Sequence, residues 1–132
     1  MKAAAWLAGA GLCAANGLWA QTPCTLPPDA GVRLMSGPVQ LAWRAEPTPI
    51  VVGQPFAVLL TLCPAQAQLT RVDATMPEHR HGMNYRPSLQ DLGGGLWRAQ
   101  GLLWHMAGRW ELRLDVAAEG TTHTLHQGVT LR

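Results

Sequence analysis

The sequence predicts an all-β protein built as a β-sandwich. Short segments in which apolar and polar side chains alternate recur along the chain, and Gly and Pro clusters separate them. No segment shows a sustained helical period with caps. Roughly seven short strands separated by turns are typical of an immunoglobulin-like sandwich, which is the architecture we expect.

The first 20 residues have the pattern of a signal peptide rather than of a structural element. A positive start, Met1-Lys2, precedes an apolar run, residues 3–12, that is too short to span a bilayer as a helix. Cleavage after Ala20 would remove 20 of the 132 residues and leave 112, enough for one domain. We therefore expect an exported protein, periplasmic or secreted, whose mature chain begins near Gln21.

Residues 21–37 are rich in Pro and Gly and are predicted to form an irregular N-terminal arm, followed by one domain over residues 38–132. Two cysteines remain after cleavage, Cys24 and Cys63. An even pair in an oxidising compartment predicts a disulfide, which would tie the arm to a core strand and contribute roughly 3–4 kcal/mol. A thiolate metal site is disfavoured because both cysteines are single and far in sequence from the histidines.

The first half of the domain contains three predicted strands. Residues 39–44 alternate apolar and polar side chains and end before a Pro- and Gly-rich break. Residues 56–62 are a nearly continuous apolar run between two prolines, as expected for a buried strand. Residues 69–76 alternate less cleanly, and Pro77 ends them.

The second half begins at the glycines 93–95, which precede a strand over residues 96–104. The turn 106–109 leads into the clearest alternation of the chain, residues 110–116, where one face is apolar and the other charged. Gly120 then turns the chain into a last strand. We find no internal repeat and no second domain.

Composition excludes several classes of function. The mature chain keeps nine arginines and eight acidic residues, a net charge of +1, whereas nucleic-acid binding needs a clustered basic surface. No second apolar stretch predicts a membrane span in the mature chain. We find no nucleophile with a base nearby, no Gly-rich phosphate loop and no paired carboxylates, so we expect no enzyme.

Donor side chains suited to a soft metal gather in two short segments. They are His79, His81, Met83, His105 and Met106. On an extended backbone His79 and His81 project from one face, roughly 7 Å apart at their roots, and Gly82 lets Met83 bend toward them. His105 and Met106 are neighbours, so only one of them could join from a regular strand, unless the turn after Met106 relaxes this restriction.

This set of donors predicts copper. Imidazole and thioether select copper over magnesium or calcium, and together they suit Cu(I) better than Cu(II), which two histidines could also hold. The predicted activity is binding and carriage rather than turnover. His123 and His126 have the pattern of ordinary strand-surface residues and are not expected to be ligands.

The same residues also have a structural interpretation. Met76, Met83 and Met106 could fill the end of the sandwich core, because methionine packs readily into irregular gaps. His79 could simply belong to a solvated loop. The chain would then be a metal-free interaction or accessory module of a periplasmic or membrane complex.

Two segments carry a resemblance to a known family. The stretch Met76-Pro-Glu-His-Arg-His-Gly-Met83 and, after a Gly-rich hairpin, Gly101-Leu-Leu-Trp-His-Met-Ala-Gly-Arg-Trp-Glu-Leu-Arg-Leu-Asp115 resemble the YtkA-like domain, which is related to FixH-type proteins. The resemblance covers residues 69–116, about half of the mature chain. It implies a small exported immunoglobulin-like sandwich, and several relatives are associated with copper handling or with assembly of copper-containing oxidases.

By this resemblance, His79, His81 and Met83 fall on the family's His/Met-rich segment. Met106 falls on its Met-x-Gly-x-Trp turn, which implies a structural role for that methionine. The chain departs from the family in having Ala107 where the turn usually has Pro, and in having a cleavable signal where FixH-type proteins usually carry a membrane anchor.

The chain is also similar in part to periplasmic copper chaperones of the PCuAC type. The spacing of 21 residues between Met83 and His105 matches the second half of that motif. Taken together, these features predict a periplasmic copper carrier or metallochaperone, whose partner would be a periplasmic or membrane cuproprotein.

Overall fold

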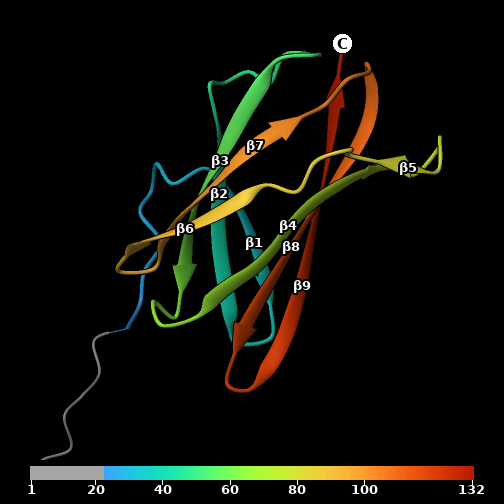
Figure 1. Cartoon of the computed structure of the whole chain (residues 1–132). Coiled ribbons are helices and arrows are strands. Elements are labelled where there is room, and N and C mark those ends of the chain that lie inside the picture. Colours follow the sequence, from blue (N-terminus) through green and yellow to red (C-terminus); the bar gives the residue numbers. More distant parts are fainter. Residues whose placement is uncertain (1–22) are drawn as a thin grey trace, which may run out of the picture.

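The computed structural model describes residues 23–132, so the predicted signal peptide, residues 1–20, lies outside the described residues. The described chain contains nine strands, which Figure 1 labels in the order in which they occur along the chain. They are β1 (Val32–Ser36), β2 (Val39–Glu46), β3 (Pro55–Cys63), β4 (Gln68–Met76), β5 (His81–Gly82), β6 (Ser88–Gly93), β7 (Leu96–Leu103), β8 (Gly108–Ala118) and β9 (Thr121–Leu131).

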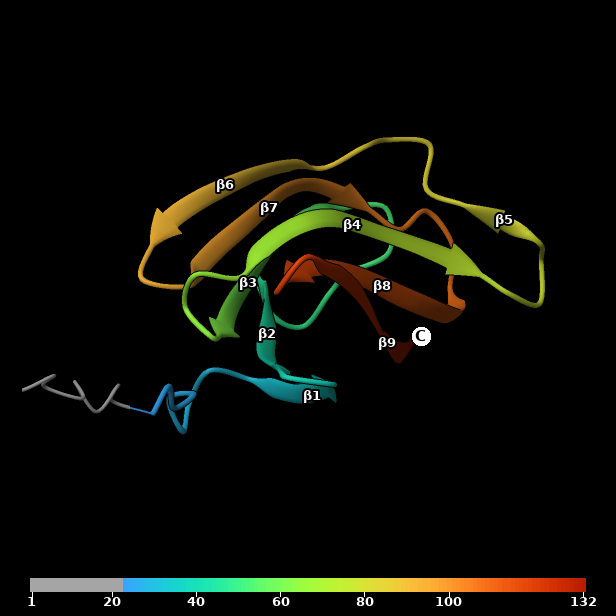
Figure 2. The ribbon, with the colours of Figure 1, turned by 90° about the horizontal axis from the view of Figure 1, so that it is seen from below.

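The strands form two antiparallel sheets that pack face to face (Figure 2). One sheet has the order β1-β2-β3-β7-β6 and the other has the order β5-β4-β8-β9. A β-sandwich is therefore confirmed, but with nine strands in place of about seven. The immunoglobulin-like class of the sandwich stays a prediction.

Three strands were not expected from the sequence. β1 lies inside the predicted irregular arm, residues 21–37. Its five residues stand between two turn-forming glycines, Gly31 and Gly37. The two-residue turn after Ser36 places Gly37 at a φ of 54°, which suits a tight hairpin. The prediction of an irregular arm is thus wrong for residues 32–36.

The other two unexpected strands, β5 and β6, carry almost no apolar alternation. β5 has only two residues, and β6 is an edge strand in which every side chain except that of Leu89 is exposed. An exposed edge strand has no buried face, so no period-two pattern marks it in the sequence.

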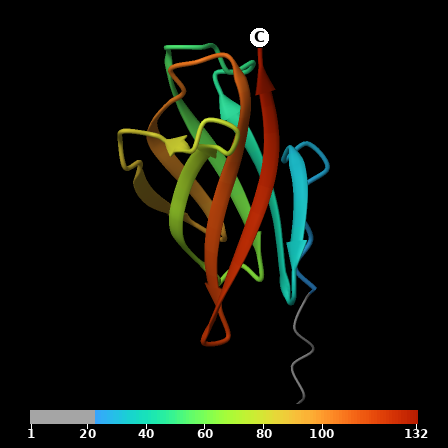
Figure 3. The same ribbon diagram turned by 90° about the vertical axis from the view of Figure 1, so that its right-hand side faces the viewer.

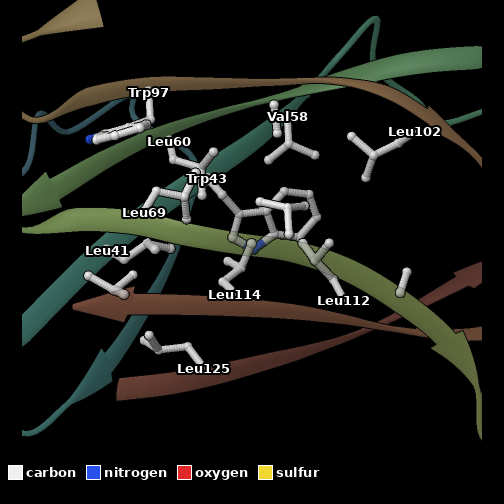
Figure 4. Packing of buried hydrophobic residues seen from close by; sticks show 14 of the residues in the cluster. Leu41, Trp43, Val58, Leu60, Leu69, Trp97, Leu102, Leu112, Leu114 and Leu125 are labelled. Carbon is white, nitrogen blue, oxygen red and sulfur yellow. The ribbon is translucent and has the colours of Figure 1, made fainter. Parts of the chain in front are cut away.

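The core lies between the two sheets, where alternate side chains of β2, β3, β7 and β8 interdigitate (Figure 4). The largest fully buried side chains are Trp104, Trp110, Leu41, Leu60, Leu62, Met76, Leu102, Leu112 and Leu114. This burial explains why the clean alternation of residues 110–116 predicted its strand correctly.

The N-terminal arm packs on the outer face of the first sheet. Leu26 and Ala30 form a small buried cluster with Ala42 and Cys63. The disulfide between Cys24 and Cys63 fastens the arm to the end of β3, with the two Cα atoms 5.5 Å apart. The predicted disulfide is therefore confirmed.

Within residues 23–132, no helix is long and apolar enough to cross a membrane.

Candidate metal centre

The turn between β4 and β5 presents the first two candidate histidines. Pro77 follows the last residue of β4, and the backbone N–H of His79 donates to the carbonyl of Met76 at 3.1 Å. Proline suits the second position of such a turn because its φ is already set. Arg80 then takes a φ of 53°, a left-handed conformation that returns the chain to β5.

β5 places His81 on the inner side of its sheet. His81 pairs with Met76 across the β4–β5 ladder, and paired residues of antiparallel strands point to the same face. Met76 is fully buried, so that face is the core side. The backbone N–H of Met83 donates to Ala74 at 3.1 Å, which keeps the following segment beside β4.

The loop from β7 to β8 brings the second pair of candidates to the same end of the sandwich. Trp104 is fully buried, and its carbonyl accepts a 2.8 Å hydrogen bond from the N–H of Gly53. Four residues beyond Met106, the indole N–H of Trp110 donates to the Met106 carbonyl at 3.0 Å. These two bonds hold the ends of the loop, while His105 remains exposed between them.

Two histidine rings, His81 and His105, lie against Trp110, and the ring of His79 lies beside that of His81. The ring centres of His79 and His81 are 5.8 Å apart, and those of His81 and His105 are 5.2 Å apart. His81 and His105 each meet Trp110 edge to face, with ring centres 6.1 and 5.6 Å away. Two of the three histidines therefore cover the same indole.

The aromatic contacts continue from the histidines into the core. Trp110 stacks on Trp104 with ring centres 5.2 Å apart and planes only 5° apart, and Trp104 meets Phe56 edge to face at 5.1 Å. All three rings are buried. The histidines thus rest on a rigid base, and a ligand site supported by such a base is better preorganised than one on a free loop.

The ring separations are compatible with a shared ion. A metal roughly 2 Å from a ring nitrogen lies roughly 3 Å from the ring centre, so two rings on one ion have centres within roughly 6 Å. The planes of His79 and His81 differ by 30°, and those of His81 and His105 by 34°.

Even so, the described part of the chain contains no group of three or more His, Cys, Asp or Glu side chains placed to hold a metal ion. Any metal bound in the described conformation would need fewer such donors or the addition of thioether sulfur.

The methionines of the site differ in their burial. Met76 is fully buried, whereas Met83 and Met106 are partly buried and pack against the core. If a Cβ were added at Gly108, it would lie 2.8 Å from the terminal methyl of Met76, so the Met76 side chain reaches under the turn that follows His105. Each of these three methionines therefore contributes to packing, as the structural interpretation expects.

Two histidines stay apart from this cluster. Part of the His123 ring lies near Gly37 at the β1–β2 turn, and the Nδ1 of His126 lies 3.1 Å from a carboxylate oxygen of Glu111. The sequence assigned both to strand surfaces. β9 places His126 on the outer surface, but His123 lies opposite the buried Val116 and is half-buried on the inner face of the strand.

Asp115 is the one buried charged side chain among the described residues, and it lies outside this cluster, in the outer-face ladder of β8 and β9. Burial pushes the pKa of Asp115 upward, but hydrogen bonds from Arg113 and Thr124 outweigh it and hold the pKa below its ordinary value. This carboxylate is therefore a structural anion paired within its own ladder.

Sequence reasoning placed Trp110 in the core but did not identify it as the support of the histidines. The only signal for that role was its position at the start of the alternation, directly after the turn that holds His105. The strand register then brings Trp110 next to β5, because β4 pairs with both β5 and β8.

No protein-family model, no curated protein and no solved structure matches this chain.

Proposed function

We propose that this chain is an exported copper-binding protein, a periplasmic copper carrier or metallochaperone. The observation that carries the proposal is the meeting of His79, His81 and His105, from two separate loops, within ring-centre distances of 5.2 and 5.8 Å. Histidines that only contact solvent have no reason to lie beside an imidazole from another loop.

The proposed ligand set joins imidazoles of both loops to a thioether. His81 and His105 form the closest pair, and His79, Met83 and Met106 are the additional candidates. Imidazole with thioether favours Cu(I) over Cu(II). His79 and His105 are exposed and His81 is partly covered, and both His81 and His105 lie against Trp110.

The proposal includes export and a receiving partner. Removal of residues 1–20 on export would leave a chain with the Cys24–Cys63 disulfide, which suits an oxidising compartment. The resemblance to YtkA-like and PCuAC-type proteins belongs to the same proposal and suggests a periplasmic or membrane cuproprotein as the receiver of the metal.

The decisive measurement is a titration of the metal-free exported chain with Cu(I) against a competing chelator under anaerobic conditions. We expect one Cu(I) per chain, and we expect the double variant His81→Ala/His105→Ala to bind at least about tenfold more weakly. The matched control is His123→Ala/His126→Ala, which removes two histidines outside the cluster and should bind as the wild type does. Equal affinity of all three proteins would refute the proposed site.

A metal-free interaction module is the second candidate function. It is favoured by the edge-to-face contacts of His81 and His105 with Trp110, because imidazoles that cover a buried indole have a packing role without any metal. In that case copper leaves the thermal unfolding of the chain unchanged, and alteration of the exposed β4–β5 turn removes capture of the partner complex.

A further inference from the structure

The first sheet has an incomplete edge at the end that carries the histidines. β1 begins at Val32, opposite Trp43, whereas β2 continues to Glu46. The last three residues of β2 pair with β3 on one side. On the other side they have no partner strand among residues 23–132, but Gly31 lies against Trp43 and Arg44, so the free stretch is Ala45 and Glu46. A strand with one open side presents unpaired N–H and C=O groups there.

An open cleft of about 650 Å³ lies beside this incomplete edge. The residues that line the cleft come from both sheets and from the loop after β2. They include Val32, Trp43, Ala45, Ile50, Val129 and Leu131. Val32 and Val51 are each 45% exposed there, and so belong to the few large hydrophobic side chains that the described chain leaves in water.

The opposite wall of the cleft is a second free edge. β9 is the last strand of its sheet, and its C-terminal residues 129–131 line the cleft. Figure 3 shows β9 and β1 side by side, with the C-terminal end of β9 at the same end of the sandwich as β5. The cleft is thus bordered by the edges of two sheets.

The rim of the cleft carries positive charge. Arg44 and Arg132 line it, and the Arg44 side chain is 45% exposed. Arg44 lies 3.7 Å from Glu46, but Glu46 forms its closer ion pair with Arg98. No acidic side chain is among the described residues that line the cleft, so Arg44 and Arg132 make its rim positive.

We propose that this cleft binds an extended, acidic and apolar peptide segment of a partner protein as an added strand beside β2. Peptides that add to a sheet edge gain affinity from backbone hydrogen bonds and specificity from alternate side chains. A residue opposite Ala45 would point into the apolar cleft, and its neighbours would point outward toward Arg44. The cleft therefore selects apolar residues that alternate with acidic ones.

The two free edges favour a peptide over a lipid or other small amphiphile. An acyl chain fills apolar volume but makes no use of unpaired backbone groups, whereas an extended peptide satisfies them and fills the cleft with alternate side chains. This inference goes beyond the copper proposal and uses none of its residues, so it is tested in the presence of a chelator.

The experiment uses the ¹⁵N-labelled exported chain and three probes: a short peptide of alternating valine and glutamate, one of alternating valine and lysine, and dodecanoate. We expect the glutamate peptide alone to shift the amide signals of residues 31–32, of 44–52 apart from the two prolines, and of 129–132. Arg44→Glu should weaken binding of the glutamate peptide about tenfold and should favour binding of the lysine peptide instead. Arg86→Glu, the same charge change in the segment before β6, should leave binding unchanged.

A second variant keeps the test independent of the charge reversal. Val51→Asp replaces an exposed apolar side chain of the cleft and should weaken the glutamate peptide without unfolding the chain, which circular dichroism checks. The proposal is overturned if neither peptide shifts these amides, if dodecanoate alone does so, or if both peptides bind equally well. A dimer that Arg44→Glu dissociates would assign the cleft to a second copy of the chain and would likewise overturn it.

Discussion

Trp110 is the residue that joins the candidate site to the core. Its ring contacts His81 and His105 on one side and stacks on Trp104 on the other, while its N–H donates to the Met106 carbonyl. A single buried side chain thus orients both loops that supply the proposed ligands. Changes near Trp110 are expected to affect the loops and the core together.

Gly108 provides the first prediction at the residue scale. Its φ of 124° is unfavourable for other residues, and an added Cβ would lie 2.8 Å from the terminal methyl of Met76. We expect Gly108→Ala to destabilise the chain by about 1–3 kcal/mol and to change the near-ultraviolet dichroism of the tryptophans, measured together with urea unfolding.

Gly101→Ala is the control for this change. Gly101 also has a positive φ, 86°, but an added Cβ there would meet no atom within 4 Å. We expect it to destabilise the chain through backbone strain alone and to leave the tryptophan signal near that of the wild type. Identical spectra for the two variants would contradict the proposed role of the Met76 contact.

Asp115 gives a prediction on pH. Its pKa is lowered from the ordinary value of 3.8, so the ionised form stabilises the folded chain above that value, and this contribution is lost as the pH falls through the lowered pKa. Asp115→Asn should cost about 1–3 kcal/mol at neutral pH, because it removes charge-assisted bonds from Arg113 and weakens the one from Thr124.

The pH dependence separates this explanation from simple misfolding. The stability difference between wild type and Asp115→Asn, measured by urea unfolding, should shrink as the pH falls from about 4 to below the lowered pKa. Over this range Asp115 is protonated first in the unfolded chain and then in the folded chain as well. A difference that stays constant between pH 7 and acid would show that the charge of Asp115 is not what stabilises the fold.

At the scale of elements, the disulfide is the link between the arm and the sandwich. Among the described residues before β1, only Leu26 and Ala30 have buried apolar side chains, and Arg33 donates hydrogen bonds to the Leu26 and Pro27 carbonyls. The Cys24–Cys63 bond closes a long loop, with a sequence separation of 39, so most of its effect is on the unfolded chain.

We therefore predict that Cys24→Ser/Cys63→Ser lowers the free energy of unfolding by roughly 3–4 kcal/mol in urea titrations. Reduction of the wild type should have a similar effect, whereas the reductant should not affect the double variant. A loss far below this range would indicate that the unfolded chain is already compact in this region.

At the scale of the whole molecule, the proposed ligands come from two loops that separate on unfolding. A metal that binds only the folded chain stabilises it by about 2.7 kcal/mol when its free concentration is 100 times the dissociation constant. We expect Cu(I) buffered at that level to raise the melting temperature of the wild type but not that of His81→Ala/His105→Ala, measured by scanning calorimetry.

The sequence by itself determined the all-β class, the disulfide and most central strands. These features are local or compositional: alternation reports a buried face directly, as in residues 110–116, and the two cysteines that follow residue 20 have one possible partnership with each other. It also identified the histidines that meet, although it could not show that they do so.

Only the tertiary structure decided the rest. β5 and β6 are defined by the strands they pair with, so no pattern of their own predicts them. The meeting of His81 with His105 depends on β4, which pairs with β5 on one side and β8 on the other. The free edge beside Ala45 depends on where β1 begins. Strand pairing joins distant parts of the chain, and the residues of one strand do not encode which residues will lie opposite them.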